Sequence, residues 1–171
     1  MLKKNRPFFI AEISANHNGS LNTAKKLIKC AKENGADAVK LQTYDADSMT
    51  LKSKKKFFKI RNGLWKNFYL WDLYNKAKTP LKWHKELFKF AKRLKITIFS
   101  TPFSEEHVDF LEKLNCPFYK VSSFEMNDVN LIKKIALTKK PIIISTGVSN
   151  LNEIEIAYKT AIKYGSKKII L

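Results

Sequence analysis

Six short apolar runs recur along the chain, and a segment with helical spacing follows each of the first five. Near-continuous apolar runs are typical of parallel strands that are covered on both faces. Alternation of such strands with helices predicts right-handed β-α-β units. The predicted strands are residues 8–13, 38–44, 96–100, 117–123 and 141–145, with the start of a sixth strand at 168–171. The sequence therefore predicts an α/β fold around a parallel sheet.

Two architectures fit this alternation: an open doubly wound sheet and a (β/α)8 TIM barrel. An open nucleotide-binding sheet usually has a glycine-rich turn after its first strand, and residues 14–19 lack the Gly-x-Gly spacing. In a barrel, polar residues at the C-terminal ends of many strands converge on one mouth. Because a whole barrel takes about 250 residues, we predict an incomplete (β/α)8 TIM barrel, about strands 1 to 6 and helices 1 to 5, from the N-terminal part of a larger protein.

Polar side chains within or just after the apolar strands carry the functional signal. They are Glu12, Lys40, Gln42, Thr101, Lys120, Ser123, Glu125 and Ser145. A lysine inside an apolar strand is costly unless it has an anionic partner. Two lysines and several hydroxyls at equivalent strand positions predict a cradle for a phosphate, or for a phosphate with a carboxylate, through charge-assisted hydrogen bonds. Glu12 and Glu125 would then face a hydroxylated or amide-bearing co-substrate, or the place where a metal sits.

Each of these residues also has a structural interpretation. A strand lysine often snorkels or forms an ion pair, and Lys40 can pair with Glu12. A terminal serine or threonine can simply bond to nearby backbone. His17, in the first strand-to-helix turn, is equally compatible with a functional and a turn-stabilising role. His84 and His107 lie in helical segments, where we expect structural or solvated roles, and three histidines this dispersed predict no metal site.

Residues 45–79 form a long insertion that is basic in its first half and aromatic in its second. Connections of this length are usually functional lids or contain local structure, and we predict a short helix at 69–78. Thr79 and Pro80 predict the start of the next helix, with a capping hydroxyl followed by proline at the first helical position.

The formal net charge is +18, from 33 basic and 15 acidic residues. Such a balance is compatible with a nucleic-acid-binding module, which predicts a single basic face and steep loss of affinity with salt. Most lysines fall at solvent-facing helical positions or in residues 52–59, which favours general surface enrichment. No apolar run approaches a membrane span, and no secretory signal is recognisable. We predict a soluble cytoplasmic protein.

Several motifs, in this order, resemble the N-terminal half of the sialic acid synthase (N-acetylneuraminate synthase-like) family. They are Ala11-Glu12-Ile13, Asn16-His17-Asn18-Gly19, Val39-Lys40-Leu41-Gln42-Thr43, Ser100-Thr101-Pro102-Phe103, Tyr119-Lys120-Val121-Ser122-Ser123 and Ile144-Ser145-Thr146-Gly147. Within the family, Ser123-Phe124-Glu125 and residues 70–74 are most similar to the pseudaminic acid synthase branch. The N-acetylneuraminate and legionaminate branches usually have a small residue where Phe124 stands.

The resemblance implies condensation of phosphoenolpyruvate with a di-acetamido-trideoxy hexose to give pseudaminic acid and phosphate. C3 of phosphoenolpyruvate would attack the aldehyde, water would capture the oxocarbenium at C2, and the adduct would release phosphate. The implied phosphoenolpyruvate ligands are Lys40, Thr101, Lys120, Ser123 and Ser145. Asn16 and His17 are also implied to bind substrate, while Glu12, Gln42 and Glu125 are implied to orient the sugar or to stabilise charge. The alternative acceptors are those of N-acetylneuraminate and legionaminate synthases.

The resemblance also implies a divalent metal, Mn²⁺, whose two histidine ligands lie in the last barrel strands of relatives. Those strands and a C-terminal antifreeze-like domain are absent from this sequence, so no residue here is assigned as a ligand. The partners implied are the two substrates and a second subunit in a homodimer, without nucleic acid or membrane. We expect these 171 residues alone to be inactive and aggregation-prone. A non-catalytic remnant is the remaining alternative.

Overall fold

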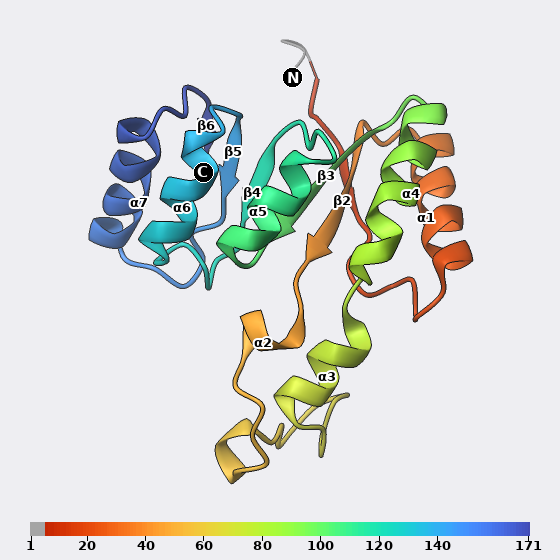
Figure 1. The fold of residues 1–171 in the computed structure, drawn as a ribbon, viewed down its shortest axis with the longest axis vertical. Helices are drawn as coiled ribbons and strands as arrows, with labels where there is room; N and C mark the ends of the chain where they lie inside the picture. The colour runs from red at the N-terminus through yellow and green to blue at the C-terminus, as the bar shows by residue number, and fades with distance from the viewer. Residues whose placement is uncertain (1–5) are drawn as a thin grey trace.

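Six parallel strands, paired in sequence order, form a half-barrel in the computed structural model, which describes residues 6–171 (Figure 1). The strands are β1 (Ile10–Glu12), β2 (Ala38–Thr43), β3 (Thr97–Pro102), β4 (Tyr119–Val121), β5 (Ile142–Ile144) and β6 (Ile169–Ile170). The barrel helices are α1 (Leu21–Glu33), α4 (Leu81–Arg93), α5 (Glu105–Glu112), α6 (Val129–Leu137) and α7 (Leu151–Lys163). The predicted incomplete barrel is confirmed.

The side chains of β2 alternate between two environments, as the pleat of a strand requires. Val39 and Leu41 are fully buried in an apolar cluster that includes Ile28 of α1 and Leu87 of α4. Lys40 and Gln42, the alternate residues, are only partly buried and point to the other face of the sheet. The helices therefore cover one face, and the polar residues of the strands are left to the concave face.

A second apolar cluster joins β3, β4 and β5 to the helices α5, α6 and α7. Leu111, Ile132 and Ala161 contribute one fully buried side chain from each of these helices. Burying a leucine or isoleucine stabilises a fold by about 1.5–3 kcal/mol relative to exposing it. These contacts fix the spacing of the strands that carry the polar residues.

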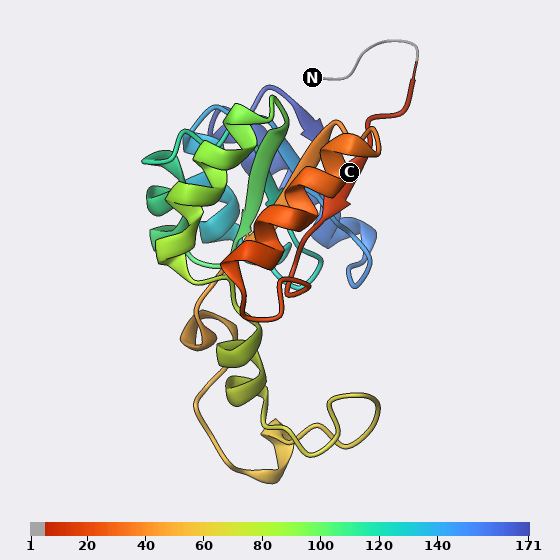
Figure 2. The ribbon, with the colours of Figure 1, turned by 90° about the vertical axis from the view of Figure 1, so that its right-hand side faces the viewer.

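The insertion between β2 and α4 extends away from the sheet, beyond the C-terminal ends of the strands (Figures 1 and 2). We call residues 45–79 the arm. It contains α2 (Ala46–Met49), a 3-10 turn η1 (Lys56–Phe58) and α3 (Leu70–Ala77), which confirms the helix predicted in its second half. Within residues 6–171, no helix has the length and apolar character needed to cross a membrane.

The prediction that Thr79 caps α4 is wrong. Pro80 occupies the N-cap position, and no side chain caps the helix there. The Thr79 side chain is buried, and its Oγ1 lies 3.2 Å from Nε2 of His17. The hydroxyl that could have capped the helix is thus used to join the end of the arm to the turn after β1.

A buried polar network links β2, β3 and α4 behind the concave face. Thr43 Oγ1 lies 2.9 Å from His84 Nε2 and 2.6 Å from Ser100 Oγ, and all three residues are fully buried. The structural role expected for His84 is therefore confirmed. Desolvation by burial lowers its pKa to about 4, so the ring is neutral at physiological pH.

We expect the free energy of unfolding to fall as the pH is lowered from 6.5 toward about 4. In that window the unfolded chain protonates His84 while the native state does not, so stability increases with pH. A shift of this size corresponds to roughly 3 kcal/mol. Urea denaturation across this range should give a shallower pH dependence for His84→Gln than for the wild type. Identical slopes in the two proteins would contradict this assignment.

Candidate active site

The C-terminal ends of the strands bring the predicted polar residues to the concave face. Strand register places Glu12 beside Lys40 and Gln42 beside Thr101. From the other half of the sheet, the Lys120 ammonium donates to Ser145 Oγ at 2.5 Å and to the Val121 carbonyl at 2.7 Å. Parallel pairing thus gathers side chains that are up to 133 positions apart in the sequence, counting from Glu12 to Ser145.

Lys120 is half-buried. It lies close enough to Lys40 for the two positive charges to affect each other. Desolvation by burial and, to a smaller extent, the positive charge of Lys40 lower the pKa of Lys120 to about 8. Glu12 and Glu125 oppose the shift. Two ammonium groups held close enough to repel each other are stabilised by an anion between them, which is the property that the predicted cradle requires.

The two lysines differ in how their charge is balanced. Lys40 forms an ion pair with Oε2 of Glu12, as its structural interpretation anticipated, and Oε1 of Glu12 accepts from the Ser14 N–H at 3.0 Å. For Lys120, no carboxylate of residues 6–171 lies within ion-pair distance of Nζ. Lys120 is consequently the cation that gains most from a bound anion.

Two buried oxygens at this mouth have no hydrogen-bond partner among the described residues: Thr101 Oγ1 and Glu125 Oε2. A buried polar atom without a partner costs about 1–3 kcal/mol, so these atoms are suited to contact a ligand. Burial raises the pKa of Glu125, although its own backbone N–H and Lys120 lower it. A raised pKa makes this carboxyl group easier to protonate than an ordinary glutamate.

Ser123 lies beside the turn after β5. The Gly147 N–H donates to Ser123 Oγ at 3.4 Å, and a Cβ atom at position 147 would also lie 3.4 Å from that oxygen. The turn after β5 and the segment after β4 are therefore in contact at this point. The neighbouring Phe124 side chain is 81% exposed, so it is free to contact a ligand at the mouth.

His17 is held by bonds within the chain. Nδ1 accepts from the Gly19 N–H at 3.1 Å, Nε2 lies 3.2 Å from Thr79 Oγ1, and the residue is 1% exposed. Asn16 belongs to the same turn, where its N–H donates to the Ile13 carbonyl. The geometry favours the turn-stabilising role for His17, and direct substrate contacts of both residues stay predictions. The partnership of His17 with Thr79 left no signal in the sequence, because the two residues are 62 positions apart.

Among residues 6–171, no three His, Cys, Asp or Glu side chains cluster closely enough to hold a metal ion. The described residues therefore do not form a metal site by themselves. The Mn²⁺ implied by the resemblance stays a prediction.

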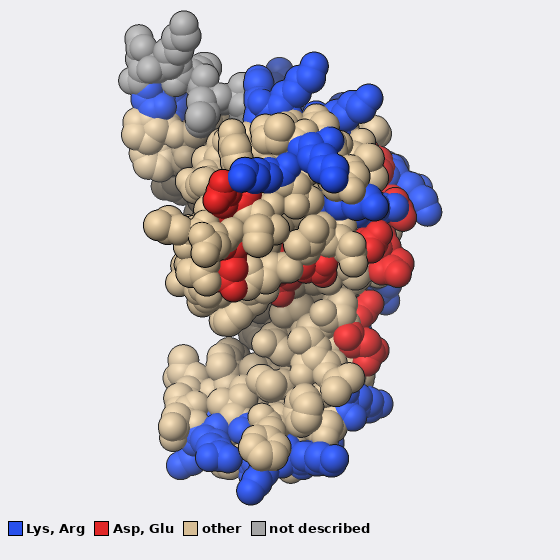
Figure 3. Space-filling view, turned by 90° about the vertical axis from the view of Figure 1, so that its left-hand side faces the viewer, with Lys and Arg blue, Asp and Glu red and all other residues tan. Residues whose placement is uncertain are grey.

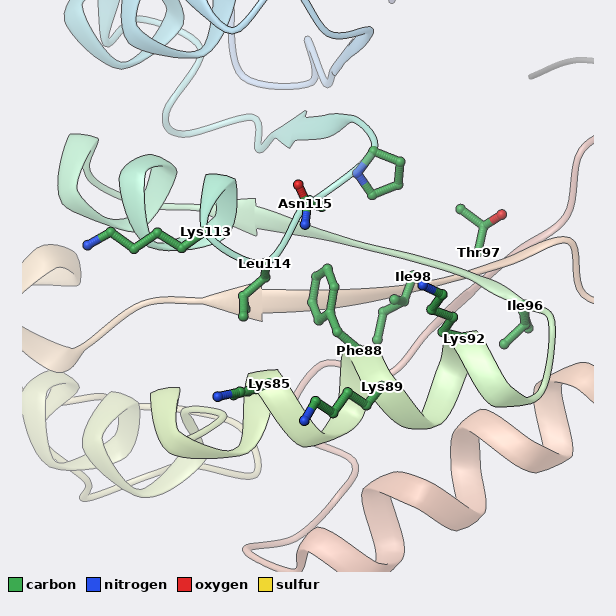
Figure 4. A pocket seen from close by; sticks show the side chains of 11 residues that line it. Lys85, Phe88, Lys89, Lys92, Ile96, Thr97, Ile98, Lys113, Leu114 and Asn115 are labelled. Atoms are coloured by element: carbon green, nitrogen blue, oxygen red, sulfur yellow. The ribbon is translucent and has the colours of Figure 1, made fainter.

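A groove of about 540 Å³ lies between α4 and the segment that follows α5 (Figure 4). Its wall includes Ile96 and Thr97, which lie just before β3 and at its first residue. The groove is therefore at the N-terminal end of the strands, whereas Thr101 and the other site residues lie at the opposite end. In barrels of this type, the C-terminal face carries the chemistry.

The fold defines the class of protein: it is an incomplete (β/α)8 barrel, and Lys40 and Lys120 lie at the C-terminal ends of its strands. The NeuB family model matches residues 27–171. Pseudaminic acid synthase of Helicobacter pylori is 52% identical over 151 residues, which cover 88% of this chain and 44% of that protein. N,N'-diacetyllegionaminic acid synthase of Campylobacter jejuni is 41% identical, over 95% of this chain and 49% of that protein.

Among solved structures, N-acetylneuraminic acid synthetase from Leptospira borgpetersenii superposes with a TM-score of 0.84 at 25% identity. The match covers 99% of this chain and 57% of that one. The chain thus belongs to the NeuB family, as the motifs predicted, and it spans less than half the length of the curated relatives described here.

We expect sulfate, used as a fully ionised probe, to bind more weakly as the pH increases through about 8. Burial and Lys40 make Lys120 lose its proton earlier than an ordinary lysine does, and the neutral amine no longer attracts an anion. Calorimetric titration on both sides of this pH measures the effect. Lys159→Ala, which changes a lysine on the exposed face of α7, should behave as the wild type does. Constant affinity across the range would refute the role of Lys120.

Proposed function

We propose that this chain provides the phosphoenolpyruvate-binding part of a nonulosonic acid synthase. The reaction joins phosphoenolpyruvate to a di-acetamido-trideoxy hexose and yields pseudaminic acid and phosphate. The observation that carries the proposal is the pair of mutually repelling ammonium groups, Lys40 and Lys120, beside the unsatisfied hydroxyl of Thr101. Phosphoenolpyruvate carries a phosphate and a carboxylate, so it offers oxygens to both lysines and to that hydroxyl at once.

Each residue of the mouth has a part in the proposed reaction. Lys120, already bonded to Ser145, would hold one anionic group, and Lys40 would hold the other. Fixing the donor in this way leaves its C3 able to attack an aldehyde carbon, which is catalysis by orientation. The ammonium groups also counter the negative charge on the phosphate as it leaves C2.

Glu125 and Gln42 suit the acceptor side of the mouth. The carboxyl of Glu125 has one buried oxygen without a partner and a raised pKa, so it can exchange a proton with the aldehyde oxygen or with the water that attacks C2. Gln42 lies two residues beyond Lys40 on the same face of β2. Its amide has donors and acceptors suited to an acetamido group.

The choice of acceptor rests on Phe124 and on the relatives. The exposed phenyl ring at the mouth suits a deoxygenated sugar better than a fully hydroxylated one. The higher identity to a pseudaminic acid synthase than to a legionaminic acid synthase, 52% against 41%, supports the same acceptor. Cytoplasmic location, assembly as a homodimer and use of Mn²⁺ are parts of the same proposal.

The distribution of charge favours an enzyme over a nucleic-acid-binding module. In the face drawn in Figure 3, basic side chains gather at the two ends, and acidic side chains lie between them. A nucleic-acid site is usually a basic patch or stripe gathered on one face of the molecule. The net charge of +18 is then best explained as general lysine enrichment that also attracts a small anionic substrate.

A complete synthase that contains this chain should release phosphate from phosphoenolpyruvate only when a suitable amino sugar is present. Coupled phosphate release with the di-acetamido-trideoxy hexose and with N-acetylmannosamine, each with and without Mn²⁺, tests the reaction and the acceptor together. The first sugar should be the better substrate. Preference for the other sugar would leave the reaction intact but overturn the choice of acceptor.

Lys120→Ala should raise the KM for phosphoenolpyruvate at least about tenfold, because a charge-assisted bond to the donor is lost. Lys159→Ala is the matched control, since that ammonium pairs with Glu155 on the surface of α7. Steady-state kinetics of the two variants measures the difference. Similar effects of both substitutions would refute the anion cradle.

A further inference from the structure

The arm joins the barrel at two places, residues 43–45 and residues 79–80, which we call its roots. All three histidines of the chain contact these roots. His17, in the turn after β1, lies 3.2 Å from the hydroxyl of Thr79 at the end of the arm. His107 of α5 has its Nε2 3.5 Å from Oδ2 of Asp45 at the start of the arm. His84 contacts the residues that flank the arm on both sides, Thr43 through Nε2 at 2.9 Å and the Pro80 carbonyl through Nδ1 at 3.3 Å.

The partners of two rings fix which nitrogen carries the proton. The Gly19 N–H can only donate, so Nδ1 of His17 accepts, and Nε2–H therefore donates to Thr79. The carbonyl of Pro80 can only accept, so Nδ1 of His84 donates to it, and Nε2 accepts from Thr43. Both rings are neutral and use both nitrogens. Neither ring retains a nitrogen for a ligand.

His107 holds the other root in a similar way. Its Nδ1 lies 2.8 Å from Ser104 Oγ, and burial lowers its pKa although Asp45 and Glu106 raise it. Asp45 itself caps α2 by accepting from the Ser48 N–H at 2.9 Å. The side chain that contacts His107 therefore also sets the direction in which the arm leaves β2.

The arm thus held lies next to the mouth. Trp65 and Leu73 of the arm, together with Asn18 and Gly19 of the turn after β1, line a hollow of about 170 Å³. Tyr44, at the root, packs edge-to-face on Phe103, just beyond β3, with ring centroids 5.5 Å apart. Figure 2 shows the arm beyond the C-terminal ends of the strands, on the side where the site residues lie.

We propose that His17, His84 and His107 are positioning residues that fix both roots of the arm, and that the arm held in this way forms the acceptor side of the mouth. The proposal rests on the synthase reaction proposed above and adds that the arm governs the sugar rather than phosphoenolpyruvate. The cradle for phosphoenolpyruvate is built from the strands and from the residues just after them, and none of its residues lies in the arm. Trp65 is 51% exposed, and its ring is the arm's surface for the less polar part of the acceptor.

The test uses Thr79→Val, which keeps the shape of the side chain and removes the hydroxyl that meets His17. Loss of one such bond should raise the KM for the acceptor about fivefold and leave the KM for phosphoenolpyruvate within about twofold. Thr79→Ser retains the hydroxyl and should restore wild-type values. Thr138→Val is the matched control, because it removes a hydroxyl bond to the Ile135 carbonyl on α6, far from the arm along the chain.

Limited trypsin digestion gives a readout that does not depend on the reaction, because residues 52–66 are rich in lysine and arginine. Cleavage within the arm should be faster in Thr79→Val than in the wild type, Thr79→Ser or Thr138→Val. Equal increases of both KM values, or unchanged cleavage of the arm, would overturn the proposal. If a complete synthase that contains the wild-type chain shows no synthase reaction, the proposed function fails, whereas the trypsin comparison still decides whether Thr79 anchors the arm.

Discussion

The half-buried ammonium of Lys120 is the constraint around which the mouth is arranged. Desolvation makes this charge unfavourable, and the nearby charge of Lys40 makes it more so. The structure offsets only part of the cost, through Ser145 Oγ and the Val121 carbonyl. Cores rarely retain such a group without a functional reason, and a site that awaits an anion supplies one. The parallel sheet matters because it holds the two lysines on one face and prevents their separation.

Much of this arrangement could be predicted from the sequence, because it follows from local rules. Alternating apolar and polar residues set the faces of β2, and repeated strand and helix patterns set the parallel order of the sheet. Lys40, Gln42 and Thr101 therefore appear where the pattern predicts them. The ion pair between Lys40 and Glu12 was also foreseeable, as one of two alternatives. The order of the strands along the chain was enough to predict that these residues lie side by side on the sheet. The packing of the helices was not needed for this prediction.

The contacts of the arm could not be predicted in this way. Thr79 was expected to cap α4, since a threonine before a proline is a good start of a helix, but a partner 62 positions away uses its hydroxyl instead. Local propensity is a weak prior when a tertiary hydrogen bond competes for the same atom. The burial of His84 has the same origin, because helical spacing indicates which face is apolar but not that the opposing strand presents the hydroxyl of Thr43.

The positive charge of Lys40 is neutralised by a carboxylate, whereas that of Lys120 is not in the described part of the chain. Lys40 already shares its charge with Glu12, so an anion that binds to Lys40 competes with that carboxylate. Lys120 has no such competitor within residues 6–171. In the proposed reaction, the first strong contact of the donor would therefore be with Lys120, and engagement of Lys40 would loosen Glu12. A carboxylate released beside the donor would then orient a hydroxyl or amide of the second substrate, which would couple the filling of one half of the mouth to the preparation of the other.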